Sequence, residues 1–281
     1  MAQVPPLDLL YVGTLPPQPG GAAVVGSQLL QRLAARGHLV RALAPISPVS
    51  RPDRAACAAK LSGVAVTWFP VPRFERAPDV PPDDDFARAE RLHLMAELPR
   101  MIREAPPDAV VMGRESFARH VPAIAQAHGV PSLMLVHGEP TRSLIRGTHP
   151  QPHAARLLAR YHQVDRIATP ARYMAAGLRR MGLRRVTVIP NGIDLDHFAP
   201  RRRDPALLSE LRIPDRHRVI LHASKLEPGK RAQDIVDSAA RVGDQWRQQW
   251  DTLRGGVGLK APPGPRLRGS AAMVPIGPIC G

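Results

Sequence analysis

The chain has 281 residues, of which 44% are hydrophobic but only 4% aromatic, so it can bury one large or two ordinary cores built from aliphatic side chains. The formal net charge of +15 suggests an anionic partner, but no basic block or basic ribbon with interleaved aromatics supports nucleic-acid binding. Two distant cysteines exclude a disulfide framework, and no apolar run of 18 residues spans a membrane.

Strands and helices alternate along the first 190 residues. An apolar run at 7–13 predicts a strand, and apolar residues at three- and four-residue spacing predict a helix that ends at Arg36-Gly37. The same patterns predict strands at 38–44, 64–69, 108–112, 131–136, 165–169 and 186–189, and helices at 55–61, 116–128, 152–161 and 171–182. A further helix, capped from Asp83 to Asp85, is expected to run through Glu104. Such alternation indicates an α/β fold with a doubly wound parallel sheet and helices on both faces.

The stretch after the last of these strands marks a domain boundary. Pro190 ends the strand, since proline cannot donate to the next position of a sheet, and Asn191-Gly192 favours a turn because both residues tolerate positive φ. We therefore expect a Rossmann-like domain, an interdomain hinge, the start of a second Rossmann-like domain and an atypical, mostly disordered tail, at 1–190, 191–205, 206–243 and 244–281. In the second domain the patterns predict a helix at 207–211, a strand at 218–223 and a helix at 232–240.

Several candidate site residues follow predicted strands, where open parallel sheets bind ligands. Gly20 and Gly21 allow close approach of a ligand to the backbone, and the helix N-terminus after them presents free N–H groups to an anion. His137 ends another strand, where a titratable side chain suits hydrogen bonding to a ligand. An ordinary glycine loop and a solvated loop histidine remain the alternatives.

Charged residues at other strand ends are weaker candidates. Glu139 and Glu115 lie at equivalent strand ends and are candidates to face the same cleft, and Arg114 is a further candidate for contact with a ligand. A plain surface carboxylate is the alternative for both glutamates and the preferred interpretation of Glu115. Lys225 and Lys230 flank a turn between a strand and a helix N-terminus, where two cations suit a diphosphate, the alternative being a charged surface turn.

No metal site is expected. The two Asp-x-Asp pairs, Asp83/Asp85 and Asp194/Asp196, have the spacing of a Mg²⁺ or Mn²⁺ ligand pair. The first pair is better interpreted as helix capping and the second as part of the turn after Pro190.

The sequence Val-Ile-Pro-Asn-Gly-Ile-Asp-x-x-x-Phe-x-Pro at 188–200 resembles the interdomain signature of the retaining family 4 of GT-B glycosyltransferases. Ser224-Lys-Leu-Glu-Pro-Gly-Lys230 is similar to the loop that follows in that family, and the resemblance covers residues 7 to about 242. It implies a GT-B fold and transfer of a sugar, with retention, from a UDP- or GDP-linked donor to a saccharide or lipid-linked acceptor. It implies no metal and no separate cofactor.

The resemblance also implies roles for single residues. His137 matches a strand-end histidine that contacts the transferred sugar, and is the candidate catalytic residue. Gly20 and Gly21 match a glycine loop near the donor phosphates, while Lys225 takes the place of an arginine, and Lys230 matches a lysine, that hold the diphosphate. Glu139 and Arg114 are the further candidates for sugar or acceptor contact.

One departure from the family concerns its second domain. The family's Glu-x7-Glu pair, which binds the donor sugar and ribose, has no counterpart after Val242, so a truncated donor domain and impaired transfer are expected. The alternative is a non-catalytic interaction or scaffold protein built on the first domain.

The expected location is cytoplasmic, because no signal peptide is visible at the first residues. Peripheral attachment to the inner face of the membrane is left open. The observation that favours it is a group of arginines along one predicted helix and its exit, at Arg172, Arg179, Arg180, Arg184 and Arg185. No nucleic-acid partner is expected.

Overall fold

The computed structural model describes residues 5–18, 20–46, 61–72 and 85–213, together with 231, 233–235, 237–238 and 241. Contacts divide the chain into two units, with the division between Ile193 and Asp194. This point lies in the segment expected as a hinge, and the two units are taken one at a time. No helix among the described residues combines the length and apolar character needed to cross a membrane.

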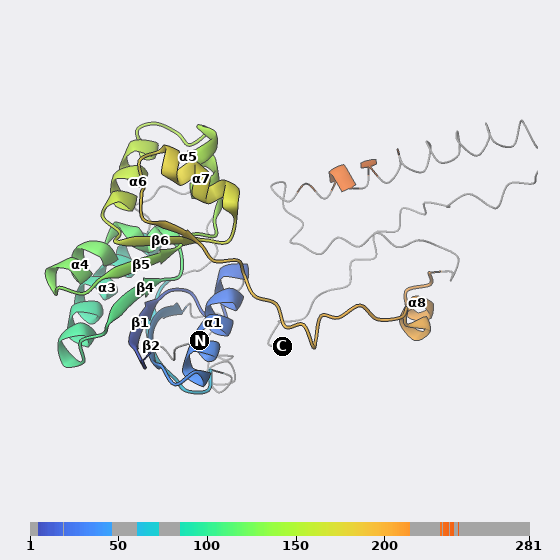
Figure 1. Cartoon of the computed structure of the whole chain (residues 1–281), viewed down its shortest axis with the longest axis horizontal. Coiled ribbons are helices and arrows are strands. Elements are labelled where there is room, and N and C mark those ends of the chain that lie inside the picture. Colours follow the sequence, from blue (N-terminus) through green and yellow to red (C-terminus); the bar gives the residue numbers. More distant parts are fainter. Residues whose placement is uncertain are drawn as a thin grey trace, which may run out of the picture. The chain divides into compact units, whose positions relative to one another are not determined.

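A parallel sheet forms the centre of the first unit (Figure 1). Among the described residues it has seven strands in the order β3-β2-β1-β4-β5-β6-β7, and every neighbouring pair is parallel. The strands are β1 (Asp8–Val12), β2 (Leu39–Ile46), β3 (Val64–Pro70), β4 (Ala109–Met112), β5 (Ser132–Leu135), β6 (Arg166–Thr169) and β7 (Val186–Val188). The expected doubly wound α/β sheet is therefore confirmed.

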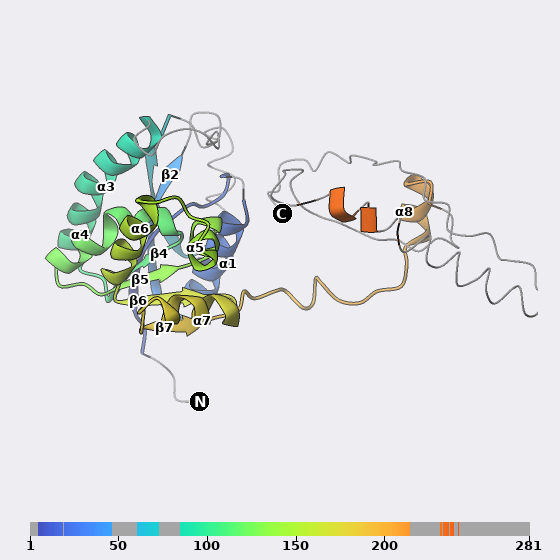
Figure 2. The same ribbon diagram turned by 90° about the horizontal axis from the view of Figure 1, so that it is seen from above.

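Helices cover both faces of this sheet, and Figure 2 shows α3 and α4 on one side of it and α1 on the other. The helical segments of the unit are α1 (Gly21–Ala35), α3 (Asp85–Glu104), the 3-10 helix η2 (Glu115–Arg119), α4 (Val121–Ala127), α5 (Glu139–Arg146), α6 (His153–His162) and α7 (Arg172–Arg180). Successive strand residues serve opposite faces, so Leu10 and Val12 join the core under α3 and α4, while Tyr11 joins the core under α1. Burial on both faces explains the nearly continuous apolar runs of the strands.

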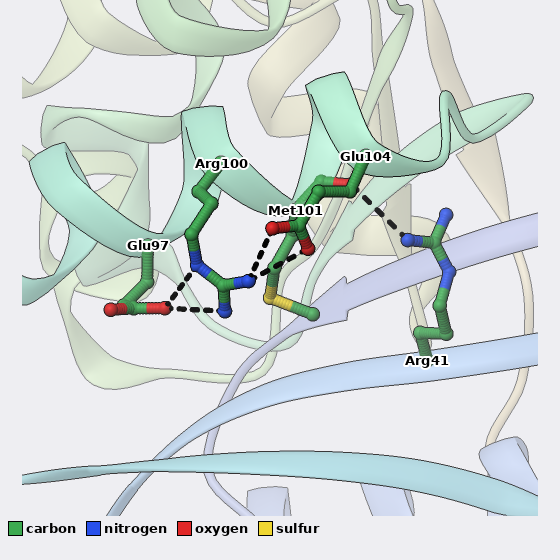
Figure 3. Close-up of polar contacts among 5 residues, drawn as sticks. All are labelled: Arg41, Glu97, Arg100, Met101 and Glu104. Atoms are coloured by element: carbon green, nitrogen blue, oxygen red, sulfur yellow. Dashed lines mark hydrogen bonds and ion pairs between the residues drawn. The ribbon is translucent and has the colours of Figure 1, made fainter.

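One arginine ties two strands to the end of a helix, and Figure 3 shows its contact with the Met101 carbonyl of that helix. Arg41 on β2 pairs with Asp8 on β1, its Nη2 lying 2.9 Å from Asp8 Oδ1. Its Nη1 donates to the carbonyl of Met101 at 3.3 Å, and its Nη2 donates to that of Ala105 at 2.6 Å. The Met101 carbonyl also accepts the Ala105 N–H at 3.2 Å, so Arg41 adds a second donor there. A cation at the C-terminus of α3 complements the helix dipole.

Two sequence predictions about helices are wrong. The single helix expected at 116–128 is two segments, η2 and α4, with Pro122 in the first turn of α4. Proline has no N–H to donate and is tolerated at the first turn of a helix but not in its interior, so the helix restarts there. The helix α5 was not expected, although Gly147, in the left-handed conformation with φ 70°, gives it an ordinary C-terminal end.

The second unit contributes the short helix α8 (Pro205–Glu210), close to the expected helix at 207–211. Asp204 caps it by accepting hydrogen bonds from the backbone N–H groups of Ala206 and Leu207 at 2.9 and 3.3 Å. None of its six residues is buried. The helix expected at 55–61, the strand at 218–223 and the tail at 244–281 lie outside the described residues, as does much of the helix at 232–240.

Candidate functional site

The sheet reverses its strand order between β1 and β4, where the chain winds in opposite directions (Figure 1). In open α/β sheets ligands bind at such a switch point, outside the carboxyl ends of the strands. Three of the predicted groups follow strands at or beside this point: Gly20-Gly21 after β1, Arg114 after β4 and His137 after β5. Because the strands are parallel, the loops that carry these residues leave the same edge of the sheet.

The N-terminus of α1 is open. Gly20 is its N-cap residue with φ 124°, a backbone conformation that favours glycine. Within the described part of the chain, no heavy atom lies within 4 Å of where a Cβ would stand at Gly20 or Gly21. Among the described residues no side chain caps this helix, and its first turn holds no acidic residue. Free N–H groups and the positive end of the helix dipole therefore suit an anion at this position.

A buried tyrosine lies beneath the switch point. The side chain of Tyr11 on β1 is fully buried, and its hydroxyl is enclosed by Gly13, Gly26 and Gly113. A Cβ at these glycines would lie 2.5, 2.4 and 1.9 Å from the hydroxyl oxygen. Burial raises the pKa of Tyr11, with the charge of Arg114 as a smaller opposing effect, so the phenol stays neutral. These glycines are thus required by the packing of Tyr11.

His137 follows β5 and is partly buried. Burial lowers the pKa of its imidazole, and the negative charge of Glu115 opposes that shift. The ring is therefore neutral near pH 7, so one of its nitrogens is a hydrogen-bond acceptor and the other is a donor. A neutral imidazole suits contact with sugar hydroxyl groups, which are themselves both donors and acceptors.

The interpretation of Glu115 as a plain surface carboxylate is wrong. Glu115 is only 6% exposed. Its Oε1 accepts hydrogen bonds from the Gly138 N–H at 2.7 Å and from Thr141 Oγ1 at 3.1 Å. Glu115 lies at the start of η2 and faces the turn between β5 and α5. No local pattern reveals this, because both partners belong to the unexpected beginning of α5.

The two weaker candidates, Arg114 and Glu139, differ in what the structure describes of them. Arg114 donates from Nη2 to Glu90 Oε2 at 3.0 Å and places its guanidinium 5.0 Å from the centre of the Phe117 ring. These contacts direct it toward α3, and a contact with sugar or acceptor stays a prediction. Glu139 begins α5, but its side chain lies outside the described part of the structure. Lys225 and Lys230 also lie outside the described residues.

Among the residues that the structure describes, no group of three or more His, Cys, Asp and Glu side chains is placed to hold a metal ion. The polar groups gathered at the edge of the sheet are instead a helix N-terminus, an imidazole and a buried carboxylate.

The sequence matches the family described as Glycosyltransferase Family 4 over residues 19–197. This range covers α1 through the strand β7 and the interdomain signature up to His197, without its last three residues at 198–200. None of the curated proteins matches the chain.

Two solved structures of Anabaena HepE share the fold. The structure in complex with UDP and glucose has 15% sequence identity and a TM-score of 0.57, and covers 83% of this chain and 58% of the HepE chain. The structure in complex with UDP-glucose has 14% identity and a TM-score of 0.56, with coverage of 83% and 57%. The chain thus spans a little over half the length of HepE, and the likeness confirms the expected GT-B type of α/β fold.

Proposed function

The chain belongs to Glycosyltransferase Family 4, and on that premise we propose that it takes part in the transfer of a sugar from a nucleotide-sugar donor to an acceptor. The proposed donor is UDP- or GDP-linked, the acceptor is a saccharide or a lipid-linked saccharide, and the anomeric configuration is retained. The UDP and UDP-glucose held by HepE, which shares the fold, support the choice of donor class. The segment 191–205 is proposed to act as the hinge on which two domains close around the substrates.

One observation carries the proposal: the open N-terminus of α1 and the neutral His137 follow loops that leave the same edge of the sheet. Departure of the nucleoside diphosphate builds negative charge on the leaving group, and fixed N–H donors and cations stabilise that charge. The backbone at Gly20 and Gly21 takes this role in the proposal. For Lys225 and Lys230 the same role rests on the sequence alone.

His137 is proposed to contact the transferred sugar. Because its ring is neutral, it orients sugar hydroxyl groups by hydrogen bonding without adding a second positive charge next to the donor. Holding the sugar in the reactive orientation raises the rate of transfer rather than the affinity for the nucleotide.

The test uses the purified full chain with UDP- and GDP-sugars, and measures release of UDP or GDP with and without saccharide acceptors. His137→Ala is expected to lower turnover by roughly a hundredfold, the size of effect seen when one fixed hydrogen-bond donor is removed from an active site. The exposed His162→Ala is the matched control and keeps full turnover. Turnover that is equal in the His137 variant and the wild type contradicts the proposal, and turnover that only a second, co-purifying chain restores favours the scaffold alternative.

We further propose that the first unit docks on an anionic membrane surface. Residues 140–190 contain ten arginines and a single acidic residue, Asp165. That carboxylate is engaged, since it accepts hydrogen bonds from the Ser132 N–H and hydroxyl at 2.8 and 2.9 Å. The exposed side chains around α7 include those of Arg172, Tyr173, Arg179, Arg180, Arg184 and Arg185. Arginines with an exposed tyrosine, itself 57% exposed, suit the headgroup region of a membrane rich in anionic lipid.

A further inference from the structure

A buried carboxylate lies directly behind the turn that carries His137. Glu115 comes from the segment after β4, but both groups that bind its Oε1, the Gly138 N–H and Thr141 Oγ1, belong to the segment after β5. Burying a carboxylate costs free energy unless donors replace the lost water, so these two hydrogen bonds set the position of the side chain. Glu115 therefore links two neighbouring loops at the carboxyl edge of the sheet.

The threonine that binds Glu115 is held from its other side. Thr141 and Tyr161 are both fully buried, and their hydroxyl oxygens lie 2.6 Å apart. Since Thr141 gives its one proton to Glu115, the Tyr161 hydroxyl donates to Thr141. Burial and the charge of Glu115 both raise the pKa of Tyr161, which keeps that proton in place. The carboxylate thus ends a hydrogen-bonded chain anchored in α6.

The turn after β5 packs closely against the carboxylate of Glu115. A Cβ at Gly138 would lie 3.0 Å from both carboxylate oxygens of Glu115, closer than ordinary van der Waals contact. The backbone of Gly138 therefore approaches Glu115 as closely as the absence of a side chain permits. Because His137 is the residue directly before Gly138, a fixed Gly138 N–H also restricts the peptide that joins the two.

We propose that Glu115 is a positioning residue for His137. By holding the Gly138 N–H it fixes the turn after β5, and with it the direction in which the imidazole faces the carboxyl edge of the sheet. This inference rests on the sugar-binding role proposed for His137, and it adds a residue to that site which itself touches no substrate.

A simpler role for the same carboxylate is to cap α5. Gly138 is the N-cap residue of that helix, and a negative charge near a helix N-terminus is favourable. A cap alone stabilises α5 but has no consequence for the imidazole. The positioning role predicts one, because a Gly138 N–H that Glu115 no longer holds lets the preceding peptide, and with it the His137 ring, change its direction.

The experiment compares Glu115→Gln and Glu115→Ala with the wild-type full chain. Glutamine keeps an oxygen that accepts from the Gly138 N–H but removes the charge, whereas alanine removes both. The titration of His137 is followed by NMR on histidine-labelled protein, with His137→Asn to assign the signal, and hydrogen exchange is followed at the Gly138 amide. Glu97→Gln is the matched control, since Glu97 lies on α3 and its carboxylate binds Arg100 rather than the turn after β5.

In Glu115→Gln, the pKa of His137 is expected to fall below its wild-type value, while the Gly138 amide remains protected from exchange. In Glu115→Ala, exchange at Gly138 is expected to accelerate at least tenfold and the His137 ring signals to move. Glu97→Gln changes neither. A His137 titration that is unchanged in both Glu115 variants overturns the proposal, even if α5 is destabilised, and Glu115→Gln decides the matter should the alanine variant not fold.

The NMR measurements need no turnover, so they test the link between Glu115 and His137 even if the proposed function is wrong. With active protein, the Glu115→Ala variant is expected to lose kcat at least tenfold with a smaller change in KM, since it loosens the orientation of the sugar and not the binding of the nucleotide. If His137→Ala leaves turnover unchanged, the sugar-binding role is wrong, while the link between Glu115 and His137 is still judged by the titration.

Discussion

The hydroxyl group of Tyr11 is buried beside three glycines, and among the described residues it has no hydrogen-bond partner. Leaving a buried hydroxyl unpaired costs about 1–3 kcal/mol. Tyr11→Phe removes the group and keeps the ring, so we expect the free energy of unfolding to rise by about 1 kcal/mol, or to stay unchanged. Urea denaturation of both proteins measures the change. A loss of stability in the phenylalanine variant would show that the hydroxyl does have a partner.

His120 makes the stability of the protein depend on pH. Burial, and then the charges of Arg119, Arg91 and Arg160, lower its pKa to about 4. In the unfolded chain the pKa of histidine is about 6.5, so as the pH falls the unfolded state takes up a proton first. The stabilising contribution is therefore fully present above about pH 6.5 and is lost progressively as the pH falls toward about 4.

The variant His120→Asn is expected to flatten the pH dependence of stability in this window. The change is smaller than the full shift in pKa implies, because the ring is partly exposed to solvent. Thermal unfolding between pH 4 and 7 measures it, with the exposed His162→Asn as control. If both variants show the same change of stability with pH as the wild type, the titration of His120 does not contribute to the pH dependence of stability.

At the scale of elements, α5 and α7 meet at a glycine. A Cβ at Gly177 would lie 2.6 Å from Ile145 Cγ2 and 2.9 Å from its Cγ1 and Cδ1. Glycine to alanine in a helix is normally stabilising by about 1 kcal/mol, but overpacking costs about 1–3 kcal/mol. Here the contact with a β-branched side chain is the larger effect, and Gly177→Ala is expected to lower the free energy of unfolding.

The double variant Gly177→Ala/Ile145→Ala tests this cause. If the clash with Ile145 is responsible, the cost of Gly177→Ala disappears in the Ile145→Ala background, and the two changes are not additive. Urea denaturation of the four proteins gives the coupling free energy. Additive effects would assign the loss to another contact of Gly177.

The elements that the sequence predicts well are those with local signals. Each of the seven described strands contains an apolar run, and the glycine at the end of α1 and the valines of β7 mark where elements end or begin. The break between η2 and α4 was missed because the apolar positions on both sides of His120 fit one continuous helix. The start of α5 was missed because its N-cap side is stabilised by Glu115, 23 residues earlier in the chain.

The same distinction applies to the site. His137 and Gly20-Gly21 were predicted because strand ends are visible in the sequence and a family pattern includes them. Glu115 was not, because its burial depends on three segments that only the sheet brings together. Nothing in the sequence around Thr141 and Tyr161 indicates that their hydroxyl groups form a hydrogen bond with each other, or that Thr141 binds Glu115.

At the scale of the whole molecule, charge is distributed unevenly along the chain. We expect the full chain to float with vesicles of phosphatidylcholine and phosphatidylglycerol, and not with phosphatidylcholine alone. Arg180→Gln/Arg184→Gln is expected to weaken binding by about 2 kcal/mol, roughly thirtyfold, since each basic residue near an anionic surface contributes about 1 kcal/mol.

The control Arg36→Gln/Arg103→Gln changes the net charge equally at exposed positions on α1 and α3 and leaves vesicle binding intact. Equal weakening in both double variants would assign binding to net charge alone. Binding to duplex DNA but not to anionic vesicles would contradict the membrane proposal and favour nucleic acid as the anionic partner.

The packing of Tyr11 also bears on how such sequences diverge. One large ring fills a space that Gly13, Gly26 and Gly113 leave empty from three different segments. A related chain with a small residue at position 11 has room for side chains at the other three, so these four positions are expected to vary together. A library that varies any one of them alone should yield few folded members, whereas Tyr11→Val combined with Gly113→Ala should fold better than Gly113→Ala by itself.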